Sequence, residues 1–227
     1  MSESSIEGCD QNNRSLTAAC WTTASLTDLE NLLEIGTLGT KRAAAALCKL
    51  LHEAIVVEAP RLHTVPPHIV PRIYNLHDRP ITAIYMQLEG ELGCDLMLAF
   101  TVREAQDIVA LMTGSGATVE SGSELKRSAM EELGSIMICS FLSAIANFVG
   151  LEMIPTPPQM TTDSFDAILD SLLAKQALTS DFALIFDTSF KRSKSAVQGF
   201  LVVFPSRGLQ ELLIKSSRSN PIREGQE

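Results

Sequence analysis

The sequence predicts an α/β protein, in the broader α+β sense, in which two similar halves share one sheet. A helical pattern around Glu34 recurs around Glu132, 98 residues later (132 − 34) in a chain of 227 residues. In both halves that pattern is followed by a short apolar run ending in proline, two further strand-like runs and another helix. Either half alone would leave a sheet face uncovered, so we expect an internal duplication within one domain.

The first half begins with a long predicted helix. Residues 1–24 are rich in Ser, Asn and Thr, which is typical of a disordered tail. A helix is expected over Leu26–Ala54, followed by a strand over Ile55–Pro60. Residues 60–80 hold five prolines and predict an irregular connection with a helical turn near 69–74.

A hairpin and a capped helix complete the first half. Its expected strands are Ile81–Leu88 and Asp95–Phe100, joined by a Gly-containing turn. The helix Val102–Met112 follows, and Thr101 stands three residues before Glu104, which is the spacing of a capping box.

The second half repeats this order after a Gly/Ser linker at Thr113–Ser123. A long helix is expected to end at Val149, where Gly150 is a typical stop. The strand Leu151–Pro155 and a second proline-rich connection should follow.

The remaining elements are a helix, a hairpin and a last helix. Asp163 is expected to cap the helix Ser164–Ala174. The hairpin strands are Phe182–Phe190 and Val197–Phe204, and the last helix is Arg207–Lys215.

The domain is therefore expected to cover residues 25–215, with repeats at about 25–113 and 123–215. Residues 216–227 are expected to form a disordered tail.

Composition argues against several classes of partner and cofactor. The net charge is −9 and no basic stripe is present, so nucleic acid is not expected. The five cysteines form no CxxC pair, which indicates reduced thiols in a cytoplasm. The histidines lack metal-ligand spacing, so neither a metal nor a cofactor is expected. The uncharged run Ser135–Leu151 is shorter than a membrane span and predicts a helix buried on most of its surface.

Each long helix carries a carboxylate and a hydroxyl residue three positions apart, with another polar residue one turn earlier. The two sets are Glu30, Glu34 and Thr37 in the first helix, and Ser128, Glu132 and Ser135 in the second. Spacing alone is compatible with a solvated polar stripe. The occurrence of the pattern at matching places in both halves favours a functional site.

The two helices resemble the signature helices of the CheC family of chemotaxis proteins, which includes CheX, FliY and the middle domain of FliM. The family signature is Asp or Ser, three residues, Glu, two residues, Asn. The resemblance extends through Leu62–Pro66, the hairpin around Met86–Gly93 and Ile154-Pro155, and covers about residues 26–215.

The resemblance implies a pseudo-twofold fold with an antiparallel central sheet and two long signature helices. Phosphatase members of the family dephosphorylate the aspartyl-phosphate of the response regulator CheY. In them the signature Glu pairs with a lysine of the regulator, and the Asn holds the attacking water. CheC itself also binds the deamidase CheD.

This sequence departs from the signature at the Asn, which is Thr37 in one helix and Ser135 in the other. A hydroxyl is set closer to the backbone than a carboxamide and offers fewer hydrogen-bonding groups. We therefore expect a CheC-type protein that docks on a phosphorylated CheY-like response regulator, with weak hydrolysis. Glu132 and Ser135 rank ahead of Glu34 and Thr37, because Ser128 also fits the signature.

Two alternatives remain at this point. One is a non-catalytic interaction module that binds CheD or flagellar-switch components, which the missing Asn residues favour. The other is an unrelated enzyme with Ser135 or Cys139 as nucleophile, which is disfavoured because no base stands at a suggestive spacing.

Overall fold

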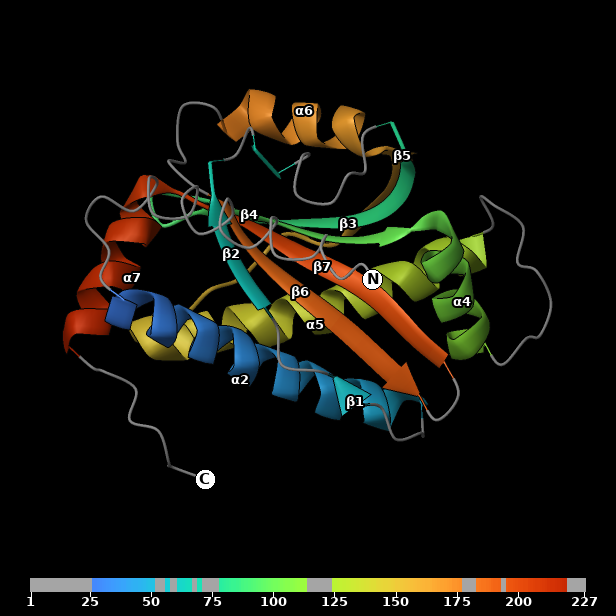
Figure 1. The fold of residues 1–227 in the computed structure, drawn as a ribbon, viewed down its shortest axis with the longest axis horizontal. Helices are drawn as coiled ribbons and strands as arrows, with labels where there is room; N and C mark the ends of the chain where they lie inside the picture. The colour runs from blue at the N-terminus through green and yellow to red at the C-terminus, as the bar shows by residue number, and fades with distance from the viewer. Residues whose placement is uncertain are drawn as a thin grey trace, which may run out of the picture.

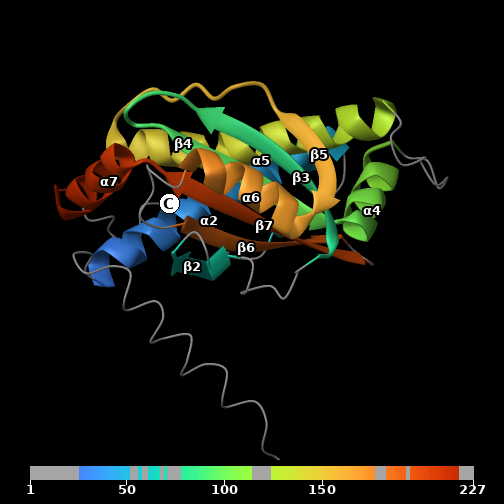
Figure 2. The ribbon, with the colours of Figure 1, turned by 90° about the horizontal axis from the view of Figure 1, so that it is seen from above.

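The described residues form one seven-stranded sheet with helices on both faces (Figures 1 and 2). The structure is a computed structural model that describes residues 26–51, 56–57, 61–66, 69–70, 78–113, 124–176, 183–192 and 195–219. The predictions for residues 1–24, for the linker at 114–123 and for residues 220–227 lie outside these ranges.

The elements follow the predicted order of two similar halves. In chain order they are α2 (Leu26–Leu51), β1 (Val56–Val57), β2 (Arg61–Val65), β3 (Pro80–Leu88), β4 (Cys94–Thr101), α4 (Val102–Thr113), α5 (Glu124–Val149), β5 (Gln159–Ser164), α6 (Phe165–Gln176), β6 (Ala183–Arg192), β7 (Ser195–Pro205) and α7 (Arg207–Ser219).

The two long helices correspond residue by residue. Both α2 and α5 are 26 residues long, and their first residues are 98 apart (124 − 26), as are their last (149 − 51). This is the same offset that separates Glu34 from Glu132. Helix α5 ends at Val149, and Gly150 after it has a φ of 72° and lets the Leu151 N–H donate to the Ala146 carbonyl at 3.0 Å. The predicted stop is confirmed.

The sheet is antiparallel throughout and interleaves the two halves. Its order is β1-β6-β7-β4-β3-β5, and β2 also pairs with β6. The hairpins β3–β4 and β6–β7 meet at the centre, where Leu96 pairs with Val203 and Leu98 with Leu201. Strand β2 of the first half pairs with β6, and β5 of the second half pairs with β3. Each half therefore completes the hairpin of the other, which explains why they share one sheet.

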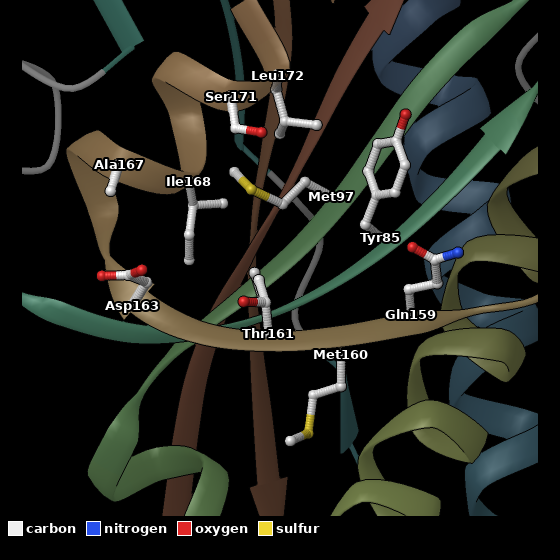
Figure 3. Close-up of a pocket in the computed structure, with 11 residues that line it drawn as sticks. Tyr85, Met97, Gln159, Met160, Thr161, Asp163, Ala167, Ile168, Ser171 and Leu172 are labelled. Carbon is white, nitrogen blue, oxygen red and sulfur yellow. The ribbon is translucent and has the colours of Figure 1, made fainter.

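Helix α6 covers one face of the sheet. The apolar cluster on this face joins Phe165 and Leu169 of α6 to sheet residues that include Met97 and Phe200. The covering is incomplete, because a groove of about 320 Å³ remains between α6, β3 and β5 (Figure 3).

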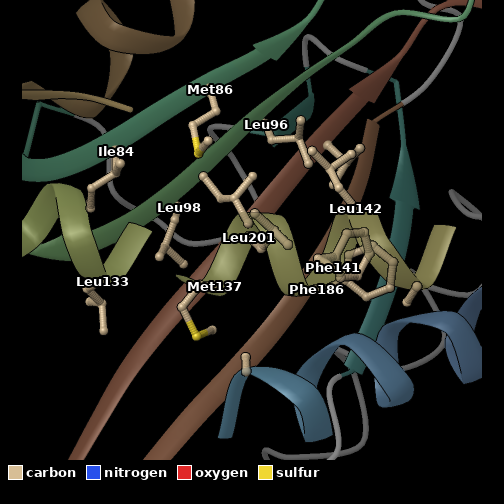
Figure 4. Packing of buried hydrophobic residues seen from close by; sticks show 14 of the residues in the cluster. Ile84, Met86, Leu96, Leu98, Leu133, Met137, Phe141, Leu142, Phe186 and Leu201 are labelled. Atoms are coloured by element: carbon tan, nitrogen blue, oxygen red, sulfur yellow. The ribbon is translucent and has the colours of Figure 1, made fainter. Parts of the chain in front are cut away.

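The larger cluster lies on the other face, between the sheet and helices α2, α4, α5 and α7. Figure 4 shows side chains of α5 interleaved with those of the strands. Helices α2 and α5 lie side by side and run in opposite directions (Figure 1). A Cβ added at Gly39 of α2 would stand 3.0 Å from the Phe141 Cα of α5. The absence of a side chain at Gly39 lets the two helices approach closely.

Helix α5 is the core helix of this face. Among the described residues it alone is long and apolar enough, by length and composition, to cross a membrane. Only 44% of its most apolar stretch is buried, so the expectation of a helix buried on most of its surface was too strong. Its buried residues face the sheet and α2, and its other side is an outer face.

Two strand predictions were wrong. Residues 151–158 contain no strand, and β5 begins only at Gln159. The Thr156 N–H donates to the Gln87 carbonyl of β3 at 2.7 Å, but Pro157 and Pro158 lack the N–H groups that a ladder needs, so the regular pairing with β3 starts at Gln159. Conversely, β2 forms at Arg61–Val65, within the stretch predicted to be irregular.

Two helix ends also differ from prediction. The Ala167 N–H is 3.3 Å from the Ser164 Oγ, so Ser164 caps α6, while Asp163 accepts from the Ser164 N–H at 2.7 Å. Helix α7 continues past Lys215 to Ser219, because Ser217 is buried against α2. The predicted capping box of α4 is confirmed: the Thr101 N–H donates to the Glu104 carboxylate at 2.9 Å.

Candidate functional site

The polar residues of α2 lie on the side of the helix that faces away from the core. Glu30 is exposed, and Glu34 and Thr37 are half-buried. Neither carboxylate has an ion pair or hydrogen bond within the described parts of the chain. The Thr37 hydroxyl donates to the Leu33 carbonyl at 2.9 Å. The face therefore presents two unpaired acids, while its hydroxyl is bonded to its own helix.

The corresponding residues of α5 have a similar arrangement. Ser128 and Glu132 are exposed, and Ser135 is half-buried. The neighbouring Glu131 is 3.1 Å from the Arg127 Nε and so has an ion-pair partner. Glu132 has none among the described residues. Of these two consecutive glutamates, Glu132 stands at the signature position, and it is the one that can pair with a partner protein.

The Ser135 hydroxyl lies beside the Cys139 thiol, one turn further along α5. Burial raises the pKa of Cys139, and the neighbouring Ser135 opposes that shift. A thiol with a raised pKa is a poor nucleophile near neutral pH, which weighs against the enzyme alternative with Cys139 as its reacting group.

The two polar faces are separate. Because α2 and α5 run in opposite directions, the first turns of α2 lie next to α7, whereas the first turns of α5 lie next to α4 (Figure 1). Glu34 and Glu132 both belong to the N-terminal part of their helix. The structure thus places the predicted residues in two sets at opposite ends of the helix pair, and does not join them in one site.

The two faces have different surroundings. Leu33 and Leu38 flank Glu34 and are 39% and 40% exposed. At the corresponding positions of α5, 98 residues later, stand Glu131 and Ile136. Leu125 of α5, seven residues before Glu132, is 55% exposed, so both faces offer exposed apolar surface, and on α2 it lies next to Glu34 itself.

A buried polar contact near the α2 face was not found from the sequence. The Asn31 Nδ2 donates to the Ser217 Oγ at 2.6 Å, and both residues are buried. Asp28 is 2% exposed and lies 3.8 Å from the Arg218 guanidinium. These contacts fasten the last turn of α7 to the first turns of α2, beside Glu30 and Glu34. Asp28 and Asn31 each lie four residues before a buried residue, Leu32 and Ile35 respectively, on the same side of α2, and this spacing was the available signal.

Metal-binding geometry is not found in the described residues, where no three His, Cys, Asp or Glu side chains gather as ligands. His63 lies in β2, opposite Ile185 of β6. The other three histidines lie outside the described ranges.

Comparison with known proteins points to chemotaxis and flagellar-switch proteins. No family model matches the chain. The CheY-P phosphatase CheC of Bacillus subtilis (strain 168) is 26% identical over 164 residues, which are 71% of this chain and 78% of that protein. The crystal structure of Thermotoga maritima FliY aligns with a TM-score of 0.68 and 16% identity, over 87% of this chain and 99% of that one. The FliM middle domain from H. pylori aligns with a TM-score of 0.61 and 10% identity, over 84% and 99%.

These similarities confirm the predicted fold and the resemblance to the CheC family. At such low identity the solved structures establish the shared fold alone. The predicted pseudo-twofold arrangement with two long signature helices is the fold observed here.

Proposed function

We propose that this CheC-like chain is a chemotaxis signalling protein of the cytoplasm that docks on a phosphorylated CheY-like response regulator. The observation that carries the proposal is the pair of signature carboxylates, Glu34 and Glu132. They occupy matching positions on two helices of equal length, on outward faces, and neither has a partner among the described residues. Unpaired acids on an outward face are suited to pairing with a cation of a partner.

The signature glutamates would supply the specificity of docking. By the family resemblance, each pairs with a lysine of the regulator. An ion pair that loses its water at an interface is strong when both partners are present, and removing one partner leaves the other charge buried and unpaired. Reversing the charge of a signature glutamate should therefore weaken docking strongly.

Hydrolysis of the aspartyl-phosphate should be weak. Phosphoryl transfer depends mainly on positioning the attacking water in line with phosphorus. The Thr37 hydroxyl donates to the Leu33 carbonyl, and the Ser135 hydroxyl lies beside the Cys139 thiol. Each hydroxyl can still accept a hydrogen bond from a water, but it is set closer to the backbone than the carboxamide of Asn and would hold that water further from phosphorus. A misplacement of about 1 Å can cost roughly 100-fold in rate.

The two faces should not bind equally. The α5 face has the fuller signature, with Ser128, Glu132 and Ser135, whereas the α2 face adds the exposed Leu33 and Leu38. We assign the phosphorylated regulator to the α5 face first. The apolar side chains around Glu34 suit a partner that buries apolar surface there.

The second candidate is a non-catalytic interaction module. The replacement of both signature Asn residues, by Thr37 and Ser135, favours it, since the carboxamide that would orient water is missing from both helices. In this reading the partner is a component of the flagellar switch or the deamidase CheD, and binding does not depend on phosphorylation of a regulator.

A titration separates these candidates. The affinity of the full chain for a CheY-like regulator is measured with and without phosphorylation, for the wild type and for Glu132→Lys. We expect that binding requires phosphorylation of the regulator and that Glu132→Lys lowers the affinity at least about 10-fold. Asp170→Lys makes the same change of charge on α6, across the sheet, and should bind as the wild type does. Binding that ignores phosphorylation, or that survives Glu132→Lys, would favour the second candidate.

A further inference from the structure

Strand β5 forms an edge of the sheet whose outer side is not paired by any described residue. The Phe165 N–H donates to the Arg79 carbonyl at 3.0 Å, next to the pair Pro80 and Ser164. Backbone groups alternate in direction along an antiparallel strand. The odd-numbered residues of β5 therefore bond to β3, and the backbone groups of the even-numbered residues Met160, Thr162 and Ser164 point away from the sheet.

The bonding capacity of this edge is limited at both ends. The Ser164 N–H is taken by its own neighbour, the Asp163 carboxylate, at 2.7 Å. Pro158, just before the strand, has no N–H to donate. The complete donor and acceptor pairs that face outward are those of Met160 and Thr162.

We propose that β5 pairs with β5 of a second copy of this chain, antiparallel and about a twofold axis at Thr161. In this register Met160 of each copy lies opposite Thr162 of the other, so each outward N–H meets a carbonyl. Pro158 lies opposite Ser164, and this pair adds no hydrogen bond, because Pro158 has no N–H and the Ser164 N–H is already bonded. The edge is thus complementary to itself at Met160 and Thr162.

Side chains favour the same register. Gln159, Thr161 and Asp163 line the groove on the α6 face, as Figure 3 shows. Pairing about Thr161 sets the Gln159 amide opposite the Asp163 carboxylate of the second copy, twice by symmetry. A twofold axis at Thr162 instead would place Asp163 opposite Thr161, and the pair between Gln159 and Asp163 would be lost. The chosen register keeps the two carboxylates apart and gives each a donor.

Both faces leave room for the second copy. Helix α5 passes over β3, where a Cβ added at Gly134 would meet the Ile84 side chain at 2.3 Å. Three strand spacings would separate β3 from its symmetry mate, which is about 14 Å and exceeds the 8–10 Å of packed helices. On the other face, the groove lies between α6 and β5 and leaves open space beside the strand.

Sedimentation velocity of the full chain tests the proposal. A short edge contact is weak, so the series should run from about 10 μM to about 1 mM protein. We expect the wild type to shift from monomer to dimer within this range. Thr162→Pro removes an outward N–H that β3 does not use and should stay monomeric. Thr162→Ser keeps that N–H and the hydroxyl that lies 3.1 Å from the Thr82 hydroxyl, and should dimerise as the wild type does.

Two charge variants at the exposed Gln159 test the same proposal if Thr162→Pro does not fold. Gln159→Lys adds an opposite charge facing Asp163 and should lower the dissociation constant, roughly 2- to 30-fold over both symmetric pairs. Gln159→Glu should raise it by a similar factor. A wild type that stays monomeric at the highest concentration overturns the proposal, as does dimerisation that is the same in all of these variants.

Discussion

The distance between α5 and the sheet is set by a single missing side chain, and we expect Gly134→Ala to destabilise the protein. A Cβ at this position would stand 2.3 Å from the Ile84 Cγ2 and 2.8 Å from the Ile84 Cβ. Ile84 is fully buried in the central sheet, so it has little freedom to move. Overpacking costs about 1–3 kcal/mol, and so short an approach to a fully buried side chain puts this case at about 2–3 kcal/mol, against which the better helix propensity of Ala recovers about 1 kcal/mol.

The net loss should be about 1–2 kcal/mol, which corresponds to a fall of roughly 2–8 °C in Tm for a chain of this size. Urea unfolding measures it, provided that the slope with denaturant stays unchanged. Ser143→Ala, at an exposed position of the same helix, is the control and should stay within about 0.5 kcal/mol of the wild type.

A double-mutant cycle with Ile84→Ala tests the cause. Ile84→Ala alone should cost about 2–5 kcal/mol, because it opens a cavity under α5. In that background the added methyl at 134 meets fewer atoms, so its cost should fall by at least about 1 kcal/mol. Strict additivity of the two substitutions, or a Gly134→Ala variant as stable as the wild type, would refute this account of the helix position.

Other contacts give further predictions. Asn31→Ala removes the donor to the buried Ser217 hydroxyl and should cost about 1–3 kcal/mol, with faster proteolysis near the end of α7 as the readout. Burial raises the pKa of Tyr85, and its hydrogen bond to Asp95 adds to the shift. The protonated phenol is therefore favoured by folding, and its contribution is complete below the unfolded pKa of about 10 and is lost as the pH rises above it. Unfolding measured between neutral and strongly alkaline pH should show a shallower alkaline loss of stability in Tyr85→Phe. Ser164→Ala removes the cap of α6 and should cost about 1 kcal/mol in thermal unfolding, whereas Ser164→Thr should cost less.

The elements that could be predicted are those whose pattern is local. The long helices, the two hairpins and the capping box of α4 follow from periodicity and turn residues within a short window. Strands β2 and β5 could not be placed, because they pair with the hairpin of the opposite half. Strand β5 is also largely exposed, so it has no buried face to create an alternating pattern.

The candidate site, too, could be predicted from the sequence only where its pattern is local. The positions of Glu34 and Glu132 on outward faces follow from helical spacing and the duplication. The contact between Asn31 and Ser217 spans 186 residues of sequence and depends on how α7 packs on α2. The bond from the Thr37 hydroxyl to the Leu33 carbonyl depends on a side-chain rotamer, which residue spacing does not determine.

Phosphate release from a phosphorylated CheY-like regulator tests the central claim most directly. It is compared for the wild type, Ser135→Asn and the double variant Ser135→Asn with Glu132→Ala. We expect little acceleration by the wild type, clear acceleration by Ser135→Asn, and loss of that gain in the double variant, since docking needs the carboxylate. A wild type that accelerates release as strongly as Ser135→Asn, or a gain that survives without Glu132, would contradict this expectation.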